Sequence, residues 1–170
     1  MLLDFKKYIF VFTTLFLSSC RGEDESDLQK IDQVLNIYIK NAEGKDLLNT
    51  NIPGGFTAVR AQDLNADRAL QDIIGISVKK DQDTIAYVDY ATGAVRILKD
   101  SISPSQKTYQ SDFYINLSKI VNKETVTDVD TVKVEYNWSP NLFQVSKVWY
   151  NNKLSFSKVE GQPNIIHIVK

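Results

Sequence analysis

After residue 28 the chain alternates apolar and polar residues with the period of two that is typical of β-strands. In the clearest segment, 131–138, the apolar face consists of Val132, Val134, Tyr136 and Trp138. Threonine, lysine, glutamate and asparagine occupy the positions between them. This pattern predicts a strand with one buried face and one solvated face.

About nine segments of this kind, separated by clusters of Gly, Pro, Asn and Asp, predict a chain of short strands. The expected strands are 31–39, 73–79, 84–90, 94–98, 109–118, 131–138, 143–150, 153–159 and 165–169. The expected loops are 41–46, 49–55 and 100–107. Asn151 and Asn152 stand between two strand segments, as in a two-residue hairpin turn. In two stretches, 29–39 and 62–74, a helix is the alternative.

A chain dominated by strands buries their apolar faces by packing two sheets together or by closing a barrel. Its 170 residues correspond to one domain with a short appendage. The expected strands between 73 and 98 follow one another through tight turns, which predicts an antiparallel meander. We therefore expect residues 29–170 to form an antiparallel, immunoglobulin-like β-sandwich. The sequence lacks the Cys…Trp…Cys spacing that marks antibody-type domains.

Residues 1–19 have the composition of a signal peptide for export. Lys6 and Lys7 provide a positive start, and the apolar run 8–17 follows them. A helix of this length spans about 15 Å, which is half of the ~30 Å hydrocarbon core that a membrane-spanning helix must cross. A short apolar run between positive charges and small residues is typical of a cleaved signal peptide.

Leu17, Ser18, Ser19 and Cys20 resemble the lipobox of bacterial lipoproteins, which is an aliphatic residue, two small residues and a cysteine. The resemblance implies cleavage before Cys20, a diacylglycerol thioether on its sulfur and acylation of its freed amine. Cys20 is thus the expected lipidation site and would carry fatty acids such as palmitate. Two or three acyl chains anchor a protein stably, because each buried methylene contributes about 0.8 kcal/mol.

Residues 20–28 form an expected acidic tether between the anchor and the domain. Glu23, Asp24, Glu25 and Asp27 repel one another, and the segment has little apolar surface to bury. This run resembles the short acidic signal that sends some lipoproteins of Bacteroidetes-type bacteria to the cell surface. A plain spacer is the alternative, so the periplasmic face of the outer membrane and the cell surface both stay open.

Charge and the counts of cysteine and histidine exclude several classes of function. The net charge of −1 provides no basic field, so we expect no nucleic-acid partner. His167 is the one histidine, and the one cysteine is assigned to lipid, which leaves no second imidazole or thiolate for a metal. Residues 63–67 are spaced like the start of a calcium loop, but Arg68 and Ile74 replace the required glycine and acid. We expect no metal, no cofactor and no enzymatic activity.

Several aromatic residues late in the chain are candidates for ligand contact. Trp138, Trp149 and Tyr150 are the ones we single out, because a flat apolar ring can cover the C–H groups of a sugar or a peptide side chain. Packing in the core is the alternative for each of them. Trp149 and Tyr150 are adjacent, so they face opposite sides of a strand.

The layout as a whole resembles small lipoproteins of unknown function in Bacteroidetes-type bacteria. The segments that carry this resemblance are the lipobox, 39–49, 130–136 and 148–154. In that group a G-x-D-L-L turn follows the first strand and a Y-N-G-K hairpin comes near the end, whereas Asn152 stands here in place of that glycine. The resemblance implies a location and a fold and no known chemistry.

These observations predict a lipid-anchored protein of the cell envelope with a non-enzymatic binding or structural role. Its expected partners are the membrane, through the lipidated N-terminus, and an envelope protein or a glycan. The alternative is a carbohydrate-binding accessory lipoprotein of a nutrient-uptake system.

Overall fold

The computed structural model describes residues 28–170, which form an all-β domain without a helix. The expected all-β class is therefore confirmed for this part of the chain, and neither alternative helix forms. The expected signal peptide, the lipidation site Cys20 and all of the acidic tether except Leu28 lie outside the described residues.

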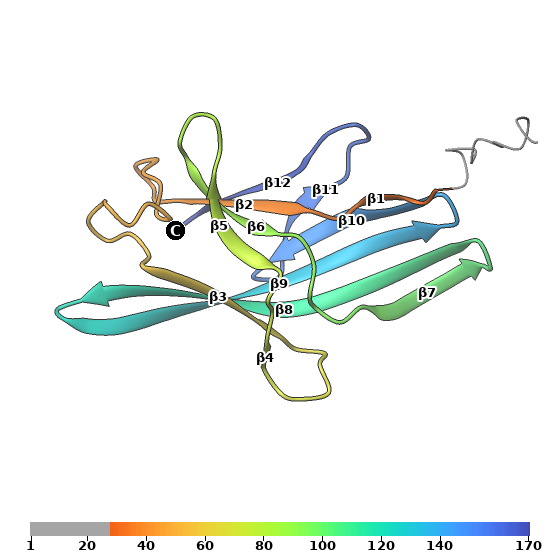
Figure 1. The fold of residues 1–170 in the computed structure, drawn as a ribbon, viewed down its shortest axis with the longest axis horizontal. Coiled ribbons are helices and arrows are strands. Elements are labelled where there is room, and N and C mark those ends of the chain that lie inside the picture. The colour runs from red at the N-terminus through yellow and green to blue at the C-terminus, as the bar shows by residue number, and fades with distance from the viewer. Residues whose placement is uncertain (1–27) are drawn as a thin grey trace, which may run out of the picture.

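The strands form two sheets that enclose one core (Figure 1). The large sheet has the order β1 (Lys30–Asp32), β10 (Leu142–Tyr150), β9 (Glu124–Ser139), β8 (Gln106–Val121), β3 (Ala58–Asp63) and β4 (Gln71–Asp72). In addition, β11 (Lys153–Ser157) pairs with β10, and β7 (Ile97–Ser103) pairs with β8. The small sheet has the order β12 (Asn164–Val169), β2 (Leu35–Lys40), β6 (Ala86–Tyr90) and β5 (Ile76–Lys80).

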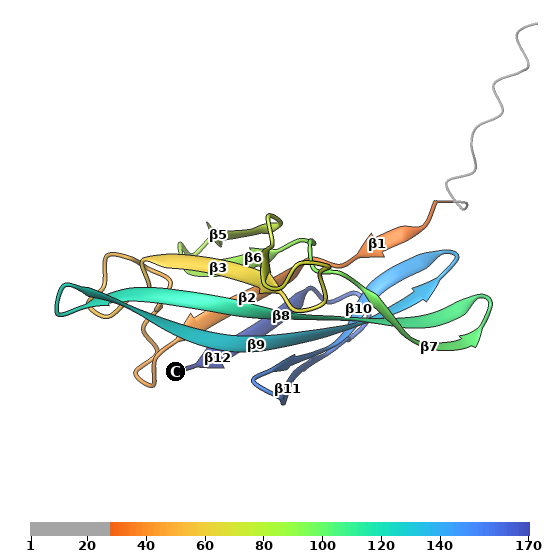
Figure 2. The ribbon, with the colours of Figure 1, turned by 90° about the horizontal axis from the view of Figure 1, so that it is seen from below.

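Both sheets are mixed, and this corrects the expectation of an antiparallel sandwich. The pairs β1 with β10 and β12 with β2 are parallel, and the remaining pairs are antiparallel. The cause lies in the expected strand 31–39, which is divided at Gln33 and Val34. Its first part joins the large sheet as β1 and its second part joins the small sheet as β2. In Figure 2, β1 lies at the end of the molecule where β7 and β9 also reach their turns.

The β8–β9 hairpin is much longer than the pattern predicts, with sixteen residues in each strand. Its tip, residues 120–129, carries exposed Ile, Thr and Val side chains that cover no core, so the alternation of buried positions ends there. Asn122 and Lys123 form its turn with φ of 52° and 69°, as a type I′ turn requires. The expected loop 100–107 is wrong, because its first half belongs to β7 and the chain turns at Pro104 and Ser105. β7 is an exposed edge strand with two register shifts, and its polar sequence therefore looks like a loop.

The hairpin turn predicted at Asn151 and Asn152 is confirmed. Asn151 and Asn152 have φ of 48° and 64° and connect β10 to β11. Asn151 also accepts a hydrogen bond on its side-chain oxygen from the backbone N–H of Thr131 at 2.8 Å. This residue thereby ties the turn to the neighbouring strand β9.

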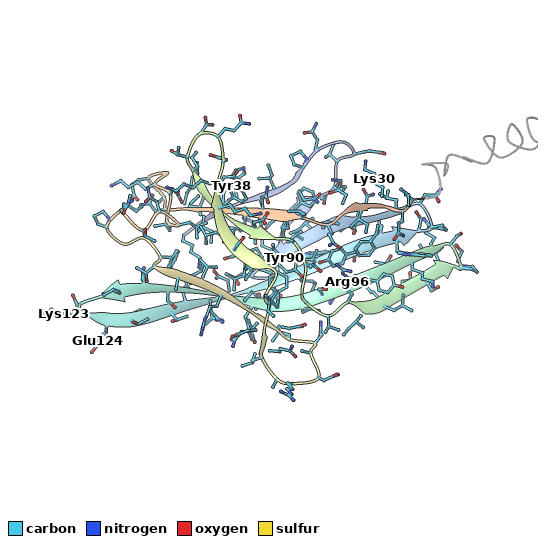
Figure 3. The ribbon with its side chains drawn as sticks, in the orientation of Figure 1. Lys30, Tyr38, Tyr90, Arg96, Lys123 and Glu124 are labelled. Carbon is cyan, nitrogen blue, oxygen red and sulfur yellow. The ribbon has the colours of Figure 1, made fainter. Side chains whose placement is uncertain are left out.

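The core lies between the two sheets and draws apolar side chains from both. Its members from the small sheet include Leu35, Ile37, Ile39, Val88 and Ile166, and those from the large sheet include Phe113, Ile115, Leu117, Val132, Val134 and Tyr136. Tyr90 of β6 stacks on Phe113 of β8 with ring centroids 4.6 Å apart, which joins the sheets directly. Figure 3 shows Tyr90 and Arg96 near the middle of the molecule. The guanidinium of Arg96 lies 4.7 Å from the ring centroid of Phe143 and donates to the Gln33 side chain at 2.6 Å.

A buried lysine fixes the place where the chain crosses between the sheets. The Lys158 side chain is only 8% exposed, and its ammonium donates to Asp32 at 2.6 Å and to Asn164 at 2.8 Å. It also donates to the backbone carbonyl of Gln162 at 2.7 Å. The Asn164 amide in turn donates to Asp32 at 2.8 Å and to the backbone carbonyl of Val34 at 2.9 Å. We call Asp32, Lys158 and Asn164 the crossing cluster.

A second polar cluster holds the last residue of the chain. Asp130 is buried and accepts hydrogen bonds from the hydroxyl of Tyr150 at 2.5 Å and the amide of Asn151 at 2.6 Å. Lys170 pairs with Asp130 at 2.5 Å and also with Asp128. Burial by itself raises the pKa of Asp130, but the hydrogen bonds from Lys170, Tyr150 and Asn151 outweigh it and hold that pKa below its usual value.

Burial acts in the same way on Asp32 of the crossing cluster. It raises the pKa of that carboxyl, and the hydrogen bonds from Lys158 and Asn164 lower it further than burial raises it. Both clusters therefore favour the ionised carboxylate in the folded chain.

Replacing Lys158 by methionine should destabilise the fold by about 3 kcal/mol, because the ionised Asp32 and the Asn164 side chain lose their buried donor. The matched control is Lys147→Met, since the Lys147 side chain is 51% exposed and lies 3.9 Å from Glu135. Lys147→Met should lower the free energy of unfolding by less than about 0.5 kcal/mol. Urea denaturation followed by tryptophan fluorescence measures both values. Equal losses in the two variants would contradict the role of the crossing cluster.

Acid should destabilise the protein through Asp130 and Asp32, whose native pKa values are depressed. Their contribution is complete above the unfolded pKa of 3.8 and disappears as the pH falls through the lower native values. Urea denaturation at a series of pH values between 7 and 2.5 tests this expectation. In Asp130→Asn the free energy of unfolding should fall less steeply as the pH decreases. In Asp72→Asn, on the exposed strand β4, its dependence on pH should be unchanged. If the free energy of unfolding of Asp130→Asn falls with pH as steeply as that of the natural chain, Asp130 does not contribute to the destabilisation by acid.

Candidate functional site

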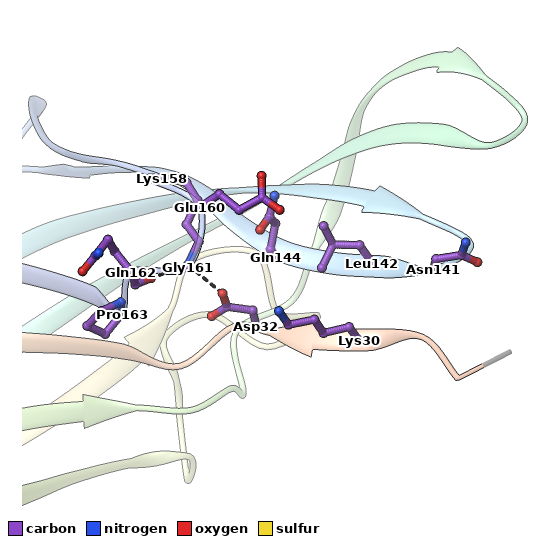
Figure 4. A pocket seen from close by; sticks show the side chains of 10 residues that line it. All are labelled: Lys30, Asp32, Asn141, Leu142, Gln144, Lys158, Glu160, Gly161, Gln162 and Pro163. Carbon is purple, nitrogen blue, oxygen red and sulfur yellow. Dashed lines mark hydrogen bonds and ion pairs between the residues drawn. The ribbon is translucent and has the colours of Figure 1, made fainter. Parts of the chain in front are cut away.

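A cleft of about 540 Å³ lies between β1, β10 and the connection from β11 to β12 (Figure 4). It is lined by Lys30, Asp32, Asn141, Leu142, Gln144, Lys158, Glu160, Gly161, Gln162 and Pro163. The wall formed by residues 158–163 stays in place because the crossing cluster ties it to β1. We call this the β1 cleft.

A second cleft of about 350 Å³ adjoins the first across β10. It is lined by Ile102, Gln106, Lys107, Thr108, Asn137, Trp138, Ser139, Leu142 and Gln144. Leu142 and Gln144 line both clefts, so the two depressions form one continuous surface. We call the second depression the β7 cleft.

A row of polar side chains crosses this surface. Strand pairing sets Asp32 opposite Gln144, Gln144 opposite Asn137, and Asn137 opposite Thr108. Directly paired residues point to the same face of a sheet, so the four side chains share the outer face of the large sheet. Four strands at about 4.8 Å spacing give the row a length of roughly 14 Å. A carboxylate, two amides and a hydroxyl thus present hydrogen-bonding groups along one line.

The structure separates the three aromatic candidates. Trp138 lines the β7 cleft, where the ammonium of Lys107 lies 5.1 Å from its ring centroid. Trp149 pairs with Lys133, roughly 17 Å farther along β9 at ~3.3 Å per residue. Tyr150 is only 4% exposed and donates its hydroxyl to Asp130, so its side chain belongs to the interior. Only Trp138 is part of the two-cleft surface.

Charges on the large sheet are mostly paired around Trp149. Glu135 is buried against Lys99 at 2.5 Å and lies 3.9 Å from Lys147. The ammonium groups of Lys99 and Lys133 lie 5.9 Å and 6.0 Å from the ring centroid of Trp149. This arrangement partly covers the ring with cations, which favours it as a packing partner of the lysines.

The small sheet carries an aromatic row that the sequence analysis did not find. His167 pairs with Tyr38, and their ring centroids lie 5.1 Å apart. Tyr87 continues the row at 5.3 Å from Tyr38. Burial and the hydrogen bond to the Asp81 carboxylate, 3.1 Å from the hydroxyl, raise the pKa of Tyr38. Alternation places each of these side chains on the face of its strand that points away from the core, but only the order of the strands shows that they are neighbours. Their partial stacking stabilises the sheet as cross-strand pairs do.

Next to this row, an open cleft of about 640 Å³ lies at the turn after β5. It is lined by Lys80, Asp81, Gln82, Asp83 and Tyr87. The Asp81 carboxylate accepts the backbone N–H groups of Asp83 and Ile85 at 3.0 Å and 2.9 Å, which fixes the turn. The carboxylate is therefore committed to the local backbone.

The segment 63–67, which resembles the start of a calcium loop, has a structural role in the described chain. The buried carboxylate of Asp63 accepts the backbone N–H groups of Asn65 at 2.8 Å and Val95 at 2.6 Å. Residues 28–170 contain no group of three His, Cys, Asp or Glu side chains that could hold a metal ion. The same residues include no helix long and apolar enough to cross a membrane.

The G-x-D-L-L turn has a clear role in the fold. Asp46 accepts the backbone N–H of Leu48 at 2.9 Å and that of Ala86 at 2.8 Å. It thereby ties the segment after β2 to the start of β6, and Leu48 is buried in the core.

No protein-family model, curated protein sequence or solved structure matches the chain.

Proposed function

We propose that this protein is a lipid-anchored component of the cell envelope whose β-sandwich binds a partner without chemical turnover. The observation that carries the proposal is the continuous surface of the β1 and β7 clefts with its polar row. Hydrogen-bonding side chains aligned across four neighbouring strands suit recognition of a polar ligand. The membrane is reached through acylated Cys20, at the outer-membrane periplasmic face or the cell surface.

The position of the surface supports this proposal. Lys30, the first residue of β1, lines the β1 cleft. The seven residues 21–27 and their flanking bonds reach at most about 28 Å from Cys20 to Leu28. The two clefts therefore lie at the end of the domain nearest to the proposed anchor. The immunoglobulin-like arrangement stays a proposal as well, supported by two sheets of short strands around one core.

A carbohydrate-binding accessory of a nutrient-uptake system is the second candidate, and the chemistry of the row favours it. Asn137, Gln144 and Asp32 offer amides and a carboxylate that match sugar hydroxyl groups. Trp138 lines the β7 cleft beside Asn137, but register places its side chain on the face of Phe143, opposite the polar row, so the row alone carries this candidate. The ligand would then be an oligosaccharide long enough to follow the roughly 14 Å row.

Anchoring through Cys20 predicts incorporation of radioactive palmitate into the full-length protein expressed in a bacterium with the lipoprotein pathway. Cys20→Ala should abolish the label and shift the protein from the membrane fraction to the soluble fraction. Ser19→Ala is the matched control, because alanine is also small and should retain both properties. Unchanged labelling of Cys20→Ala, or no label in the natural chain, would refute the anchor.

Glycan binding is tested with the lipid-anchored protein in detergent on an array of bacterial and host oligosaccharides. Gln144→Ala should weaken binding about fivefold, since each hydrogen bond to an uncharged partner contributes on the order of 1 kcal/mol. Asn137→Ala should do the same. Gln82→Ala on the small sheet and Trp149→Phe should leave binding unchanged. Binding that depends on Trp149 or Gln82 instead would place the sugar site elsewhere, and no binding at all would favour a protein partner.

A further inference from the structure

One end of the sandwich brings together three segments that are distant in sequence. They are residues 28–31 at the start of the described chain, 102–107 around the β7–β8 turn and 138–142 around the β9–β10 turn. Both turns and β1 lie at the right-hand end of Figure 1, beyond the strands of the small sheet. We call these three segments the Leu28 end. Lys123 and Glu124, at the turn of the β8–β9 hairpin, mark the opposite end in Figure 3.

The Leu28 end exposes apolar side chains. Leu28 is 76% exposed, Ile31 62% and Ile102 67%. Single exposed apolar residues are ordinary on protein surfaces, but these come from separate segments and lie at the same end of the sandwich. Strand pairing also connects Ile31 through Phe143 to Trp138, so an aliphatic and two aromatic side chains share one row.

The charge of the Leu28 end is positive. Its three segments contain Lys30 and Lys107 and no Asp or Glu. Lys107 pairs with Trp138 and lies over its ring, with the ammonium 5.1 Å from the ring centroid. A lysine beside a tryptophan and exposed aliphatic residues is the composition found at membrane–water interfaces.

We propose that the Leu28 end rests on the surface of the lipid bilayer in which the protein is anchored. This inference depends on the proposed anchoring through Cys20. The tether of residues 21–27 leaves Leu28 within about 28 Å of the acylated cysteine, so the bilayer is present at high effective concentration. Apolar side chains then enter the interface, while Lys30 and Lys107 extend toward lipid phosphates.

This contact would fix the orientation of the whole domain. The β8–β9 turn would point away from the membrane, because it lies at the opposite end of the long strands (Figure 1). The β1 and β7 clefts would lie close to the headgroups, since Leu142 lines both of them and belongs to the Leu28 end. A ligand attached to the membrane or lying along it would reach them most easily.

The test uses the full-length lipidated protein in vesicles of phosphatidylethanolamine and phosphatidylglycerol, with and without brominated acyl chains that quench tryptophan. Trp149→Phe leaves Trp138 as the reporter of the Leu28 end. Trp138→Phe leaves Trp149 as the reporter of the sheet roughly 17 Å farther along. We expect brominated lipid to quench Trp138 at least twice as strongly as Trp149.

Matched substitutions in the Trp149→Phe background identify the contact. Ile31→Asp should remove most of the quenching, whereas Ile120→Asp should leave it unchanged, because Ile120 is 64% exposed but lies near the far turn of the β8–β9 hairpin. Leu28→Asp is a second variant for the same end and lies outside every strand, so it does not perturb pairing. Circular dichroism confirms that each variant is folded.

Two failures can be told apart. If the natural chain floats with vesicles but both tryptophans are quenched equally, or Ile31→Asp and Leu28→Asp change nothing, the contact proposed here is refuted while anchoring stands. If the natural chain does not float with vesicles and Cys20 carries no palmitate, the anchoring itself is refuted and this inference falls with it.

Discussion

The structure depends on one crossing, at Gln33 and Val34, where the first strand leaves the large sheet and joins the small one. Polar groups in the interior must find partners, and the crossing cluster supplies them through a single buried lysine. Lys158 holds Asp32 at the end of β1 and Asn164 at the start of β12, and Asn164 reaches the carbonyl of Val34. These bonds set β1 beside β10 and β12 beside β2, the two parallel pairs of the fold.

The same crossing shapes the surface to which we assign binding. With β1 beside β10, Asp32 completes the polar row, and residues 158–163 form the wall of the β1 cleft. It also fixes where the chain leaves the domain toward the proposed anchor. Binding surface, tether and apolar end therefore share one location. The small sheet, away from this surface, carries the aromatic row of Tyr38, Tyr87 and His167. Stacking within the row stabilises the small sheet.

Alternation located the central parts of β8, β9 and β10, because their inward residues cover the core and their outward residues meet water. It also located the turn at Asn151, where asparagine tolerates positive φ. It missed β7 and the exposed tip of the β8–β9 hairpin, residues 120–129, which bury little. It also missed the crossing, because Ile31 and Leu35 keep the same phase although they belong to different sheets. The polar row joins Asp32, Thr108, Asn137 and Gln144 from four strands, and only strand register reveals it.

Amide hydrogen exchange tests most directly whether the crossing cluster holds the fold together. Lys158→Met should be compared with the natural chain under conditions in which both are folded. We expect exchange at least ~10-fold faster in β1 and residues 158–164, since these lose their shared partner, and unchanged exchange in the centre of β8 and β9. Unchanged protection of β1, or a uniform increase over the whole domain, would contradict the claim that this cluster fixes the crossing.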